Sequence, residues 1–208
     1  MTEESKTRRR RANGEESRRR ILSSAAEVAS ERGYDGTTIA SVSKKCGLPA
    51  SSIYWHFKDK DDLIAAVIER SFATWLEAFT LAEAGSPRAQ FAEMSKRLAK
   101  ALLENPDFLR LGLMLALERR PEEVRARAMF LEVRDQAYAE VSAIMRQFAP
   151  DLEESSHKLL ATYAISAADG LFIARELGGD SVDLIGLFEL HAHLVYDAAI
   201  RLIGEERL

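Results

Sequence analysis

The sequence predicts an all-α protein of roughly nine helices, and three observations support this prediction. Apolar residues recur at helical spacing through most of the 208 residues. No segment alternates with a period of two for long enough to form a strand. Prolines fall just inside the predicted helix starts and glycines just past the ends, which is the asymmetry that helices favour.

The amino end predicts an arm and a first helix. Residues 1–14 contain the run Arg8 to Arg11 and almost no apolar side chain, which predicts a disordered arm. Helical patterning starts at Glu15 and continues to Gly33, a residue type that commonly ends helices.

Two short helices follow, joined by a glycine turn. The first spans about residues 38–46, with Thr37 or Thr38 capping its first amides. Gly47 breaks this helix, and Pro49 suits the first turn of the next one. Together they form a helix-turn-helix candidate.

The rest of the chain predicts six further helices. Asp59 caps the first of them, and Asp61 and Asp62 in its first turn complement the helix dipole. We expect one domain over residues 15–60 and a second over residues 61–208. The six helices are expected at about residues 59–83, 88–104, 106–118, 121–149, 153–177 and 181–204.

Composition and charge exclude several protein classes. With 47% apolar residues, 30% charged residues and the single cysteine Cys46, the chain is neither a disulfide scaffold nor a collagen. It has no run of eighteen apolar residues and no signal-peptide pattern, so we expect no membrane span and a cytoplasmic location. Residues 1–60 hold 13 Lys/Arg and 8 Asp/Glu (net +5), whereas residues 61–208 hold 16 and 25 (net −9). A basic front on an acidic body is typical when one part meets a polyanion, although a basic tail without a target gives the same asymmetry.

The third helix carries the most informative residues. Ile53 and Phe57 lie four residues apart and are expected to face the core. Tyr54, Trp55 and His56 then lie around the flanks and the outer surface. Aromatic and polar side chains exposed beside the two lysines that follow suit contact with phosphate.

On these residues the chain resembles the TetR (tetracycline repressor-like) transcriptional regulators. The resemblance covers about residues 15–65 and rests on Thr37-Thr38, Gly47, the run Tyr54-Trp55-His56-Phe57, and Lys60. It implies a homodimer that binds a palindromic operator in double-stranded DNA and that a small molecule in the second domain releases. The favoured function is therefore a DNA-binding repressor. The alternative is a global or activating regulator without a small-molecule ligand.

The expected DNA contacts combine this resemblance with side-chain chemistry. By the resemblance, Thr38, Tyr54, His56 and Lys60 are phosphate clamps. The exposed start of the third helix holds no Arg, Asn or Gln, so we expect much of the specificity from lysines, apolar contacts, water or DNA shape. The other expected DNA-binding residues are Lys44, Lys45, Ala50, Ser51, Ser52 and Trp55.

The chain departs from the family pattern at three positions. Ser43 and Cys46 stand where alanine is common, and both are small enough to let the two helices approach. Ser43 is expected to bond back to the preceding turn, and Cys46 to pack rather than to react. Pro49 replaces a common capping serine, so that side-chain cap is lost.

Other interpretations of these residues stay open. Tyr54 could be a core aromatic residue, and His56 an ordinary surface residue. The arm with Arg8 to Arg11 either contacts phosphates or the minor groove, or is a solvated tail.

The last two predicted helices are apolar over too wide a face for helices covered on one side only. Two such helices from each of two subunits would form a four-helix interface, as the resemblance implies. The alternative is an ordinary core pair. The expected dimerisation residues are Tyr163, Ala167, Leu171, Leu187, His191, Leu194 and Val195.

A pocket for a small hydrophobic or aromatic effector is expected among the helices between residues 59 and 149. Aromatic and methionine side chains line ligand cavities, although the same residues fill any core. The expected lining residues are Phe72, Trp75, Phe79, Met94, Phe108, Met114, Phe130 and Tyr138.

We expect no catalytic or metal site. His191 and His193 lie two residues apart on a helix and do not face each other. The chain has no glycine-rich phosphate loop and no nucleophile motif. No cofactor and no enzymatic activity are therefore expected. Two rival classes are a helical enzyme or lipid carrier with a vestigial front domain, and a scaffold whose helix-turn-helix binds protein.

Overall fold

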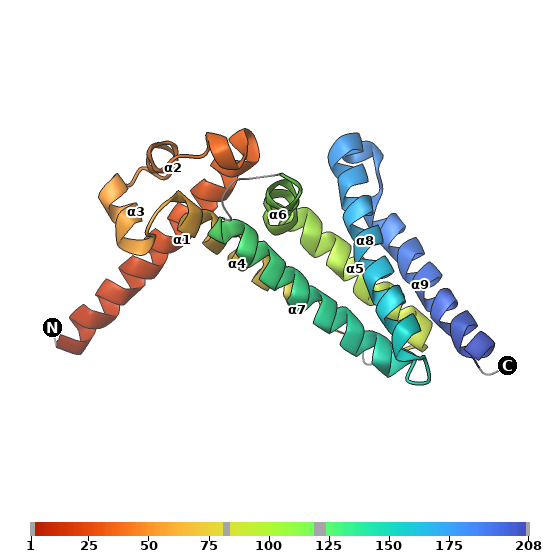
Figure 1. Ribbon diagram of the computed structural model, residues 1–208. Coiled ribbons are helices and arrows are strands. Elements are labelled where there is room, and N and C mark those ends of the chain that lie inside the picture. Colours follow the sequence, from red (N-terminus) through yellow and green to blue (C-terminus); the bar gives the residue numbers. More distant parts are fainter. Residues whose placement is uncertain (1–2, 81–83, 119–123, 207–208) are drawn as a thin grey trace. The chain divides into compact units, whose positions relative to one another are not determined.

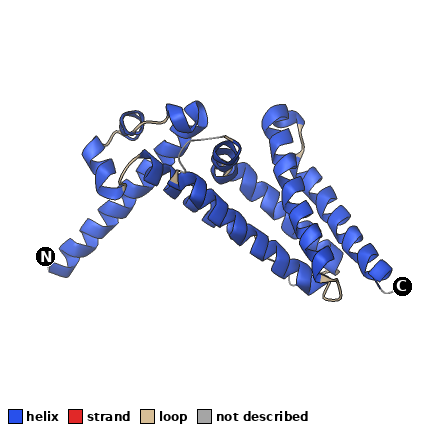
Figure 2. Ribbon diagram, in the orientation of Figure 1, coloured by secondary structure: helices blue, strands red, loops and turns tan. Residues whose placement is uncertain are grey.

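The computed structural model describes residues 3–80, 84–118 and 124–206, and every regular element within these ranges is a helix (Figure 2). The prediction of an all-α fold is confirmed. The elements, labelled in Figure 1, are α1 (Glu3–Gly36), α2 (Ile39–Cys46), α3 (Ala50–His56), α4 (Lys60–Leu76), α5 (Pro87–Glu104), α6 (Asp107–Leu117), α7 (Arg125–Phe148), α8 (Glu154–Gly178), the 3-10 turn η1 (Gly179–Ser181) and α9 (Leu184–Glu206).

Two predicted segments differ from the structure. The disorder predicted over residues 1–14 is wrong for the described part, because α1 begins at Glu3. This segment is rich in Glu, Lys, Arg and Ala, which favour a helix, and no proline interrupts it. The helix predicted over 59–83 ends at Leu76, where hydrogen bonds from Ala78 N to Trp75 O and from Phe79 N to Leu76 O tighten the chain into a turn. Residues 81–83 lie outside the described residues.

The chain forms two compact units. The amino-terminal unit comprises residues 1–72 and 107–131, and the carboxy-terminal unit comprises residues 73–106 and 132–208. The boundary predicted after residue 60 differs from this division, because most of α4, the whole of α6 and the start of α7 belong with the amino-terminal helices.

The core of the amino-terminal unit joins two short helices to two longer ones. Ile21 of α1, Val42 of α2, Ile53 of α3 and Ile64 of α4 are each 0% exposed. Each buried side chain of this size stabilises the fold by about 1.5–3 kcal/mol. Because isolated helices shorter than about 12 residues are marginal in water, α2 and α3 depend on this core.

Three of the predicted effector residues belong to that same core. The rings of Phe72 and Phe108 meet edge to face with their centroids 5.5 Å apart. Phe130 is 1% exposed and lies against Gly112, where a Cβ would come within 1.9 Å of its ring. Met114 is 47% exposed and its methyl group lies beside Gly33. Phe72, Phe108 and Phe130 are therefore packed core residues, whereas Met114 lies at the surface.

In the carboxy-terminal unit, α9 packs against both α5 and α8. Ser95 Oγ donates a hydrogen bond to the Phe188 carbonyl oxygen at 2.8 Å, and this pair ties α5 to α9. The four remaining predicted effector residues lie here: Trp75 and Phe79, whose ring centroids are 4.8 Å apart, Met94, which is 3% exposed, and Tyr138, which packs on an apolar cluster around Met145.

The residues predicted for dimerisation fall into two groups. Val195 is 2% exposed inside the cluster of Met145, Leu160, Ala161 and Ala164, so its prediction as an interface residue is wrong. It lies on the side of α9 that faces the core. Tyr163 and Leu194 are about half exposed, and the other four are half-buried: Ala167, Leu171, Leu187 and His191.

None of the helices in the described ranges is apolar over a long enough stretch to cross a bilayer.

Candidate nucleic-acid interface

The second helix begins with a reciprocal cap. The Thr38 hydroxyl accepts a hydrogen bond from Ser41 N at 3.0 Å, and Ser41 Oγ accepts one from Thr38 N at 3.0 Å. This capping box satisfies two of the amides that a helix start leaves unpaired. Thr38 is exposed and fixed in place, and its predicted capping role is confirmed.

The turn between α2 and α3 is closed by backbone geometry and one hydroxyl. Gly47 ends α2 with a φ of 65°, a left-handed conformation that glycine adopts without strain. Ser43 Oγ donates to the Leu48 carbonyl oxygen at 2.6 Å, so its predicted bond to the preceding turn is wrong. The Leu48 carbonyl belongs to the turn and lies within reach of this hydroxyl. Pro49 gives α3 no side-chain cap, as predicted.

The third helix presents opposite chemistry on its two faces. Ile53 and Phe57 are buried at 0% and 3% exposure, as predicted. Tyr54 is 56% exposed and Trp55 is 73% exposed, which excludes the interpretation of Tyr54 as a core residue. Large aromatic side chains exposed together on a short helix mark a binding surface rather than a stabilising feature.

The start of α3 is more covered than its aromatic end. Ser51 is exposed, whereas Ala50 and Ser52 are half-buried. Cys46 at the end of α2 is 2% exposed, with its Sγ 3.6 Å from the Ser43 carbonyl oxygen, which agrees with a packing role.

His56 lies at the end of α3 in an environment that favours its neutral form. Burial, and then the positive charge of Arg18, lower the pKa of the imidazole from its ordinary value. The guanidinium of Arg18 also lies over the Phe57 ring, 5.4 Å from its centroid. A neutral imidazole still donates one hydrogen bond, which is enough for contact with a phosphate oxygen.

Two neighbouring lysines on α2 differ in their partners. Lys45 Nζ forms ion pairs with Glu27 at 2.9 Å and with Glu31 at 3.1 Å, both on α1. Hydrogen bonds to these carboxylates raise the pKa of Lys45. Lys44 is exposed and has no ion pair among the described residues. Of the two predicted DNA-binding lysines, Lys44 is the one with a free charge.

Lys60 is held at the start of α4. Its ammonium donates to the Tyr34 carbonyl oxygen at 3.2 Å and lies 4.2 Å from the centroid of the Tyr34 ring. These two contacts hold the ammonium near one position, and an ammonium has three donors. Asp59 Oδ1 accepts from Asp62 N at 2.8 Å, which confirms the predicted cap of this helix.

The first helix contributes basic residues that the sequence interpretation missed. Arg18 lies beside α3, and a guanidinium nitrogen of Arg20 lies beside Gly47 in the turn. The Trp55 ring lies over Gly14, where a Cβ would touch it at 3.7 Å. The run Arg18-Arg19-Arg20 was a visible signal, but only the fold shows which members face the corner formed by α2 and α3.

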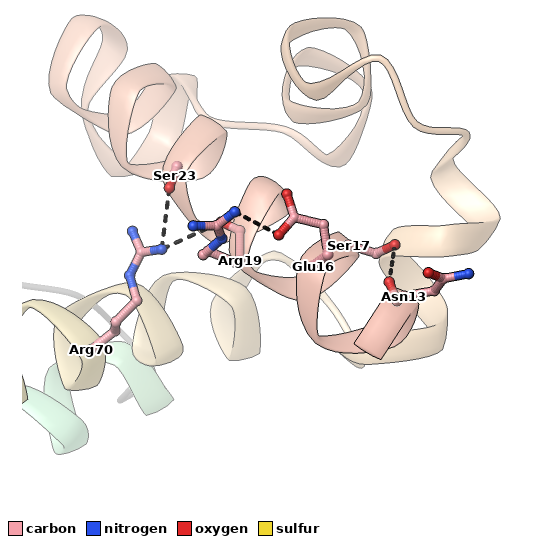
Figure 3. Close-up of polar contacts among 6 residues, drawn as sticks. All are labelled: Asn13, Glu16, Ser17, Arg19, Ser23 and Arg70. Atoms are coloured by element: carbon pink, nitrogen blue, oxygen red, sulfur yellow. Dashed lines mark hydrogen bonds and ion pairs between the residues drawn. The ribbon is translucent and has the colours of Figure 1, made fainter. Parts of the chain in front are cut away.

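Figure 3 shows the contacts that hold α1 against α4. Arg19 pairs with Glu16 on the same helix at 2.5 Å. Arg70 of α4 donates to the Arg19 carbonyl oxygen at 3.4 Å and to Ser23 Oγ at 3.3 Å. Arg70 therefore fastens α4 to α1.

Neither of two cavities within the described residues is lined by the predicted effector residues. One is an open polar groove of about 410 Å³, lined by residues of α1 together with Arg70 and Asp107. Burial raises the pKa of Asp107 in this groove. The other is a small apolar hollow among Phe91, Phe148 and Leu160.

Residues 21–67 match the family model described as "Bacterial regulatory proteins, tetR family". The HTH-type transcriptional repressor Rv1353c of Mycobacterium tuberculosis is 31% identical over 99 residues, which cover 48% of this chain and 38% of that protein. The HTH-type transcriptional regulator AcrR of Shigella flexneri is 36% identical over 64 residues, which cover 31% of this chain and 30% of that protein. The chain thus spans less than half the length of these curated relatives.

Solved structures resemble the chain over most of its length. A tetR-family transcriptional regulator from Streptomyces coelicolor matches with a TM-score of 0.71 at 19% identity, over 92% of this chain and 83% of that one. The transcriptional regulator FadR from Bacillus subtilis, solved in complex with stearoyl-CoA, matches with a TM-score of 0.72 at 18% identity, over 86% of this chain and 97% of that one. These likenesses show a shared fold. Residues 21–67, which contain the helix-turn-helix, are thus similar to the tetR family of bacterial regulatory proteins.

Proposed function

We propose that the chain is a DNA-binding transcriptional regulator that represses by occupying its operator. The observation that supports this most directly is the outer face of α3. Tyr54 and Trp55 are exposed there, and Lys44 on α2 is exposed as well. A major groove admits one helix, and lysines beside it would contact the flanking phosphates.

The proposed contacts divide by role. Thr38, Tyr54, His56 and Lys60 bind phosphates and set the register of α3 on the duplex. Ser51 and Trp55 contact base edges, where an aromatic ring suits a thymine methyl group. Ala50 and Ser52 make closer, smaller contacts, because they are half-buried. Lys44 adds a phosphate contact, and Lys45 contributes less because Glu27 and Glu31 neutralise it.

The neighbouring lysines give a matched test. A duplex is first selected from a random pool with the wild-type protein. We expect Lys44→Ala to weaken binding to it and to reduce the slope of log K against log salt by about 0.9, whereas Lys45→Ala changes both less. Lys100→Ala, at an exposed position of α5, is the control. Selection of no duplex by the wild-type protein at low salt refutes the proposed function.

We also propose a homodimer formed through the outer faces of α8 and α9. Leu159, Tyr163, Leu190 and Leu194 are each more than half exposed on these two helices. An apolar face of this kind is typical of a protein interface. A twofold axis also matches the symmetry of a palindromic operator.

A small hydrophobic effector that releases the operator completes the proposal, with the protein acting in the cytoplasm. Most of the predicted lining residues pack against other side chains within the two units, so the effector would enter by displacing packed side chains. Stearoyl-CoA, which is bound by FadR of Bacillus subtilis, is the first probe. Release of the selected duplex by stearoyl-CoA, with no release by coenzyme A alone, supports an apolar effector, and equal release by both refutes it.

A further inference from the structure

The start of α7 is capped by a residue from another helix. The Val124 carbonyl oxygen accepts the first helical bonds, from Arg127 N at 3.0 Å and from Ala128 N at 3.2 Å. Val124 therefore occupies the N-cap position, but its side chain has no acceptor for the next amides. Asp61 of α4 accepts them instead, from Arg125 N at 2.5 Å on Oδ2 and from Ala126 N at 3.1 Å on Oδ1.

The same carboxylate is also held by α1. The Tyr34 hydroxyl donates to Asp61 Oδ1 at 3.0 Å, and the Tyr34 side chain is 6% exposed. The next residue, Asp62, pairs with the Arg125 guanidinium at 2.6 Å. Three helices of the amino-terminal unit thus meet at Asp61: α1, α4 and α7.

Asp61 directly follows the proposed phosphate clamp. Lys60 donates to the backbone carbonyl of Tyr34 and lies over its ring, while Asp61 accepts from the hydroxyl of the same tyrosine. Tyr34 is therefore held by two consecutive residues of the first turn of α4. A displacement of the amino end of α7 that moves Asp61 also moves Lys60, because one rigid helical turn carries both.

We propose that Asp61 is a positioning residue for operator binding. By capping α7 and bonding Tyr34, it fixes the first turn of α4, and with it the Lys60 ammonium, relative to the amino end of α7. A carboxylate is suited to this position because negative charge at a helix amino end is stabilising. The inference rests on the proposed DNA-binding function. It adds a route by which a shift of α7 alters the affinity for DNA.

Arg125 provides a test that leaves Asp61 in place. Arg125→Pro removes the N–H that Asp61 accepts, and proline is well tolerated at the first position of a helix. Arg125→Ala removes the same guanidinium and keeps that N–H. On the duplex selected by the wild-type protein, we expect Arg125→Pro to bind roughly threefold to thirtyfold more weakly than Arg125→Ala. Equal affinities of the two variants overturn the proposal.

A double-mutant cycle separates positioning from general stability. Asp61→Asn is combined with Lys60→Ala, and Glu69→Gln, which removes a charge at an exposed position of the same helix, is the control. If Asp61 acts through Lys60, Lys60→Ala costs a smaller factor in affinity in the Asp61→Asn background than in the wild type or in Glu69→Gln. The same factor in all three backgrounds overturns the proposal.

Hydrogen exchange reports on the cap itself. We expect the amide of Ala126 to exchange faster in Asp61→Asn than in Glu69→Gln, and equal rates overturn the proposed contact. If Asp61→Asn does not fold, the Arg125→Pro and Arg125→Ala pair still decides. Failure of the wild-type protein to select a duplex refutes the proposed function instead, so the two failures are distinguishable.

Discussion

The α2–α3 corner and the α8–α9 pair expose different chemistry. The corner presents Ser51, Tyr54 and Trp55 beside cations, so its exposed surface carries hydrogen-bonding groups and positive charge. The α8–α9 pair instead exposes leucines, among them Leu177 at 84% and Leu194 at 53%. A charged polymer suits the first surface and a second protein surface suits the second. What each region leaves exposed therefore indicates its class of partner.

The two regions are also held together differently. The corner consists of helices of 8 and 7 residues, fixed by the Thr38 capping box, the Gly47 turn and the Ser43 hydroxyl. The helices α8 and α9 have 25 and 23 residues and pack along their length. Single polar contacts are thus expected to matter more for the geometry of the corner than for that of the helix pair.

The largest expected effect tests the apolar face of the helix pair. Leu194→Glu places a charge where the proposed dimer would bury it, which costs on the order of 3 kcal/mol per copy, and the twofold axis doubles that cost. We expect sedimentation at micromolar concentration to show a dimer for the wild type and a monomer for the variant. Leu103→Glu, at an exposed leucine of α5, is the control and should stay dimeric. A dimeric Leu194→Glu protein would place the interface elsewhere.

The next largest effect tests the core of the corner. Ile53 is 0% exposed, and Ile53→Ala removes buried methyl groups at a cost of about 2–5 kcal/mol in the free energy of unfolding. Trp55→Ala on the same helix should cost about 0.5 kcal/mol, because that ring is mostly in solvent. Denaturant unfolding measures the stability of both variants. Among the folded proteins, Trp55→Ala should weaken DNA binding more than Ile53→Ala does. Equal stabilities would contradict the assignment of the two faces.

A smaller effect concerns the turn. Ser43→Ala removes the hydrogen bond from Ser43 Oγ to the Leu48 carbonyl oxygen, which should lower the unfolding free energy by about 1 kcal/mol. Ser51→Ala, exposed on α3, should leave it unchanged within error. If Ser43→Ala is as stable as Ser51→Ala in thermal unfolding, the bond contributes nothing to the corner.

Much of the fold follows from periodicity and helix breakers alone. Thr38 and Asp59 cap the helices predicted for them, because a cap depends on residues three positions away. The helical state of residues 3–14 has no apolar periodicity to indicate it, and only their good helix propensity favours it. Val195 was misassigned because both sides of α9 are apolar, and the pattern does not say which side meets the core.

The sequence predicts the type of site, but not the ion pairs and hydrogen bonds that its residues form. A sequence motif indicated Lys60 and Tyr54, while the neutralisation of Lys45 by Glu27 and Glu31 depends on how α1 packs on α2. The sequence predicts only that Asp61 complements the dipole of its own helix. In the structure it caps α7, where it accepts from the amide of Arg125, 64 residues away in the chain. Such long-range bonds have no periodic signature.

The smallest expected effect uses one histidine from each region. Burial lowers the pKa of His191 on α9, and burial together with Arg18 lowers that of His56 on α3. A folded-state pKa below the unfolded value means that the folded protein binds fewer protons near pH 6, so stability is present at pH 7.5 and falls as the pH drops through 6.5. If His191 becomes more buried in the dimer, dimer dissociation should increase between pH 7.5 and 5.5. In sedimentation, dimer dissociation should depend less on pH in His191→Gln than in the wild type, and as in the wild type in His56→Gln. The same pH dependence in both variants would contradict the assignment of separate partners to the two regions.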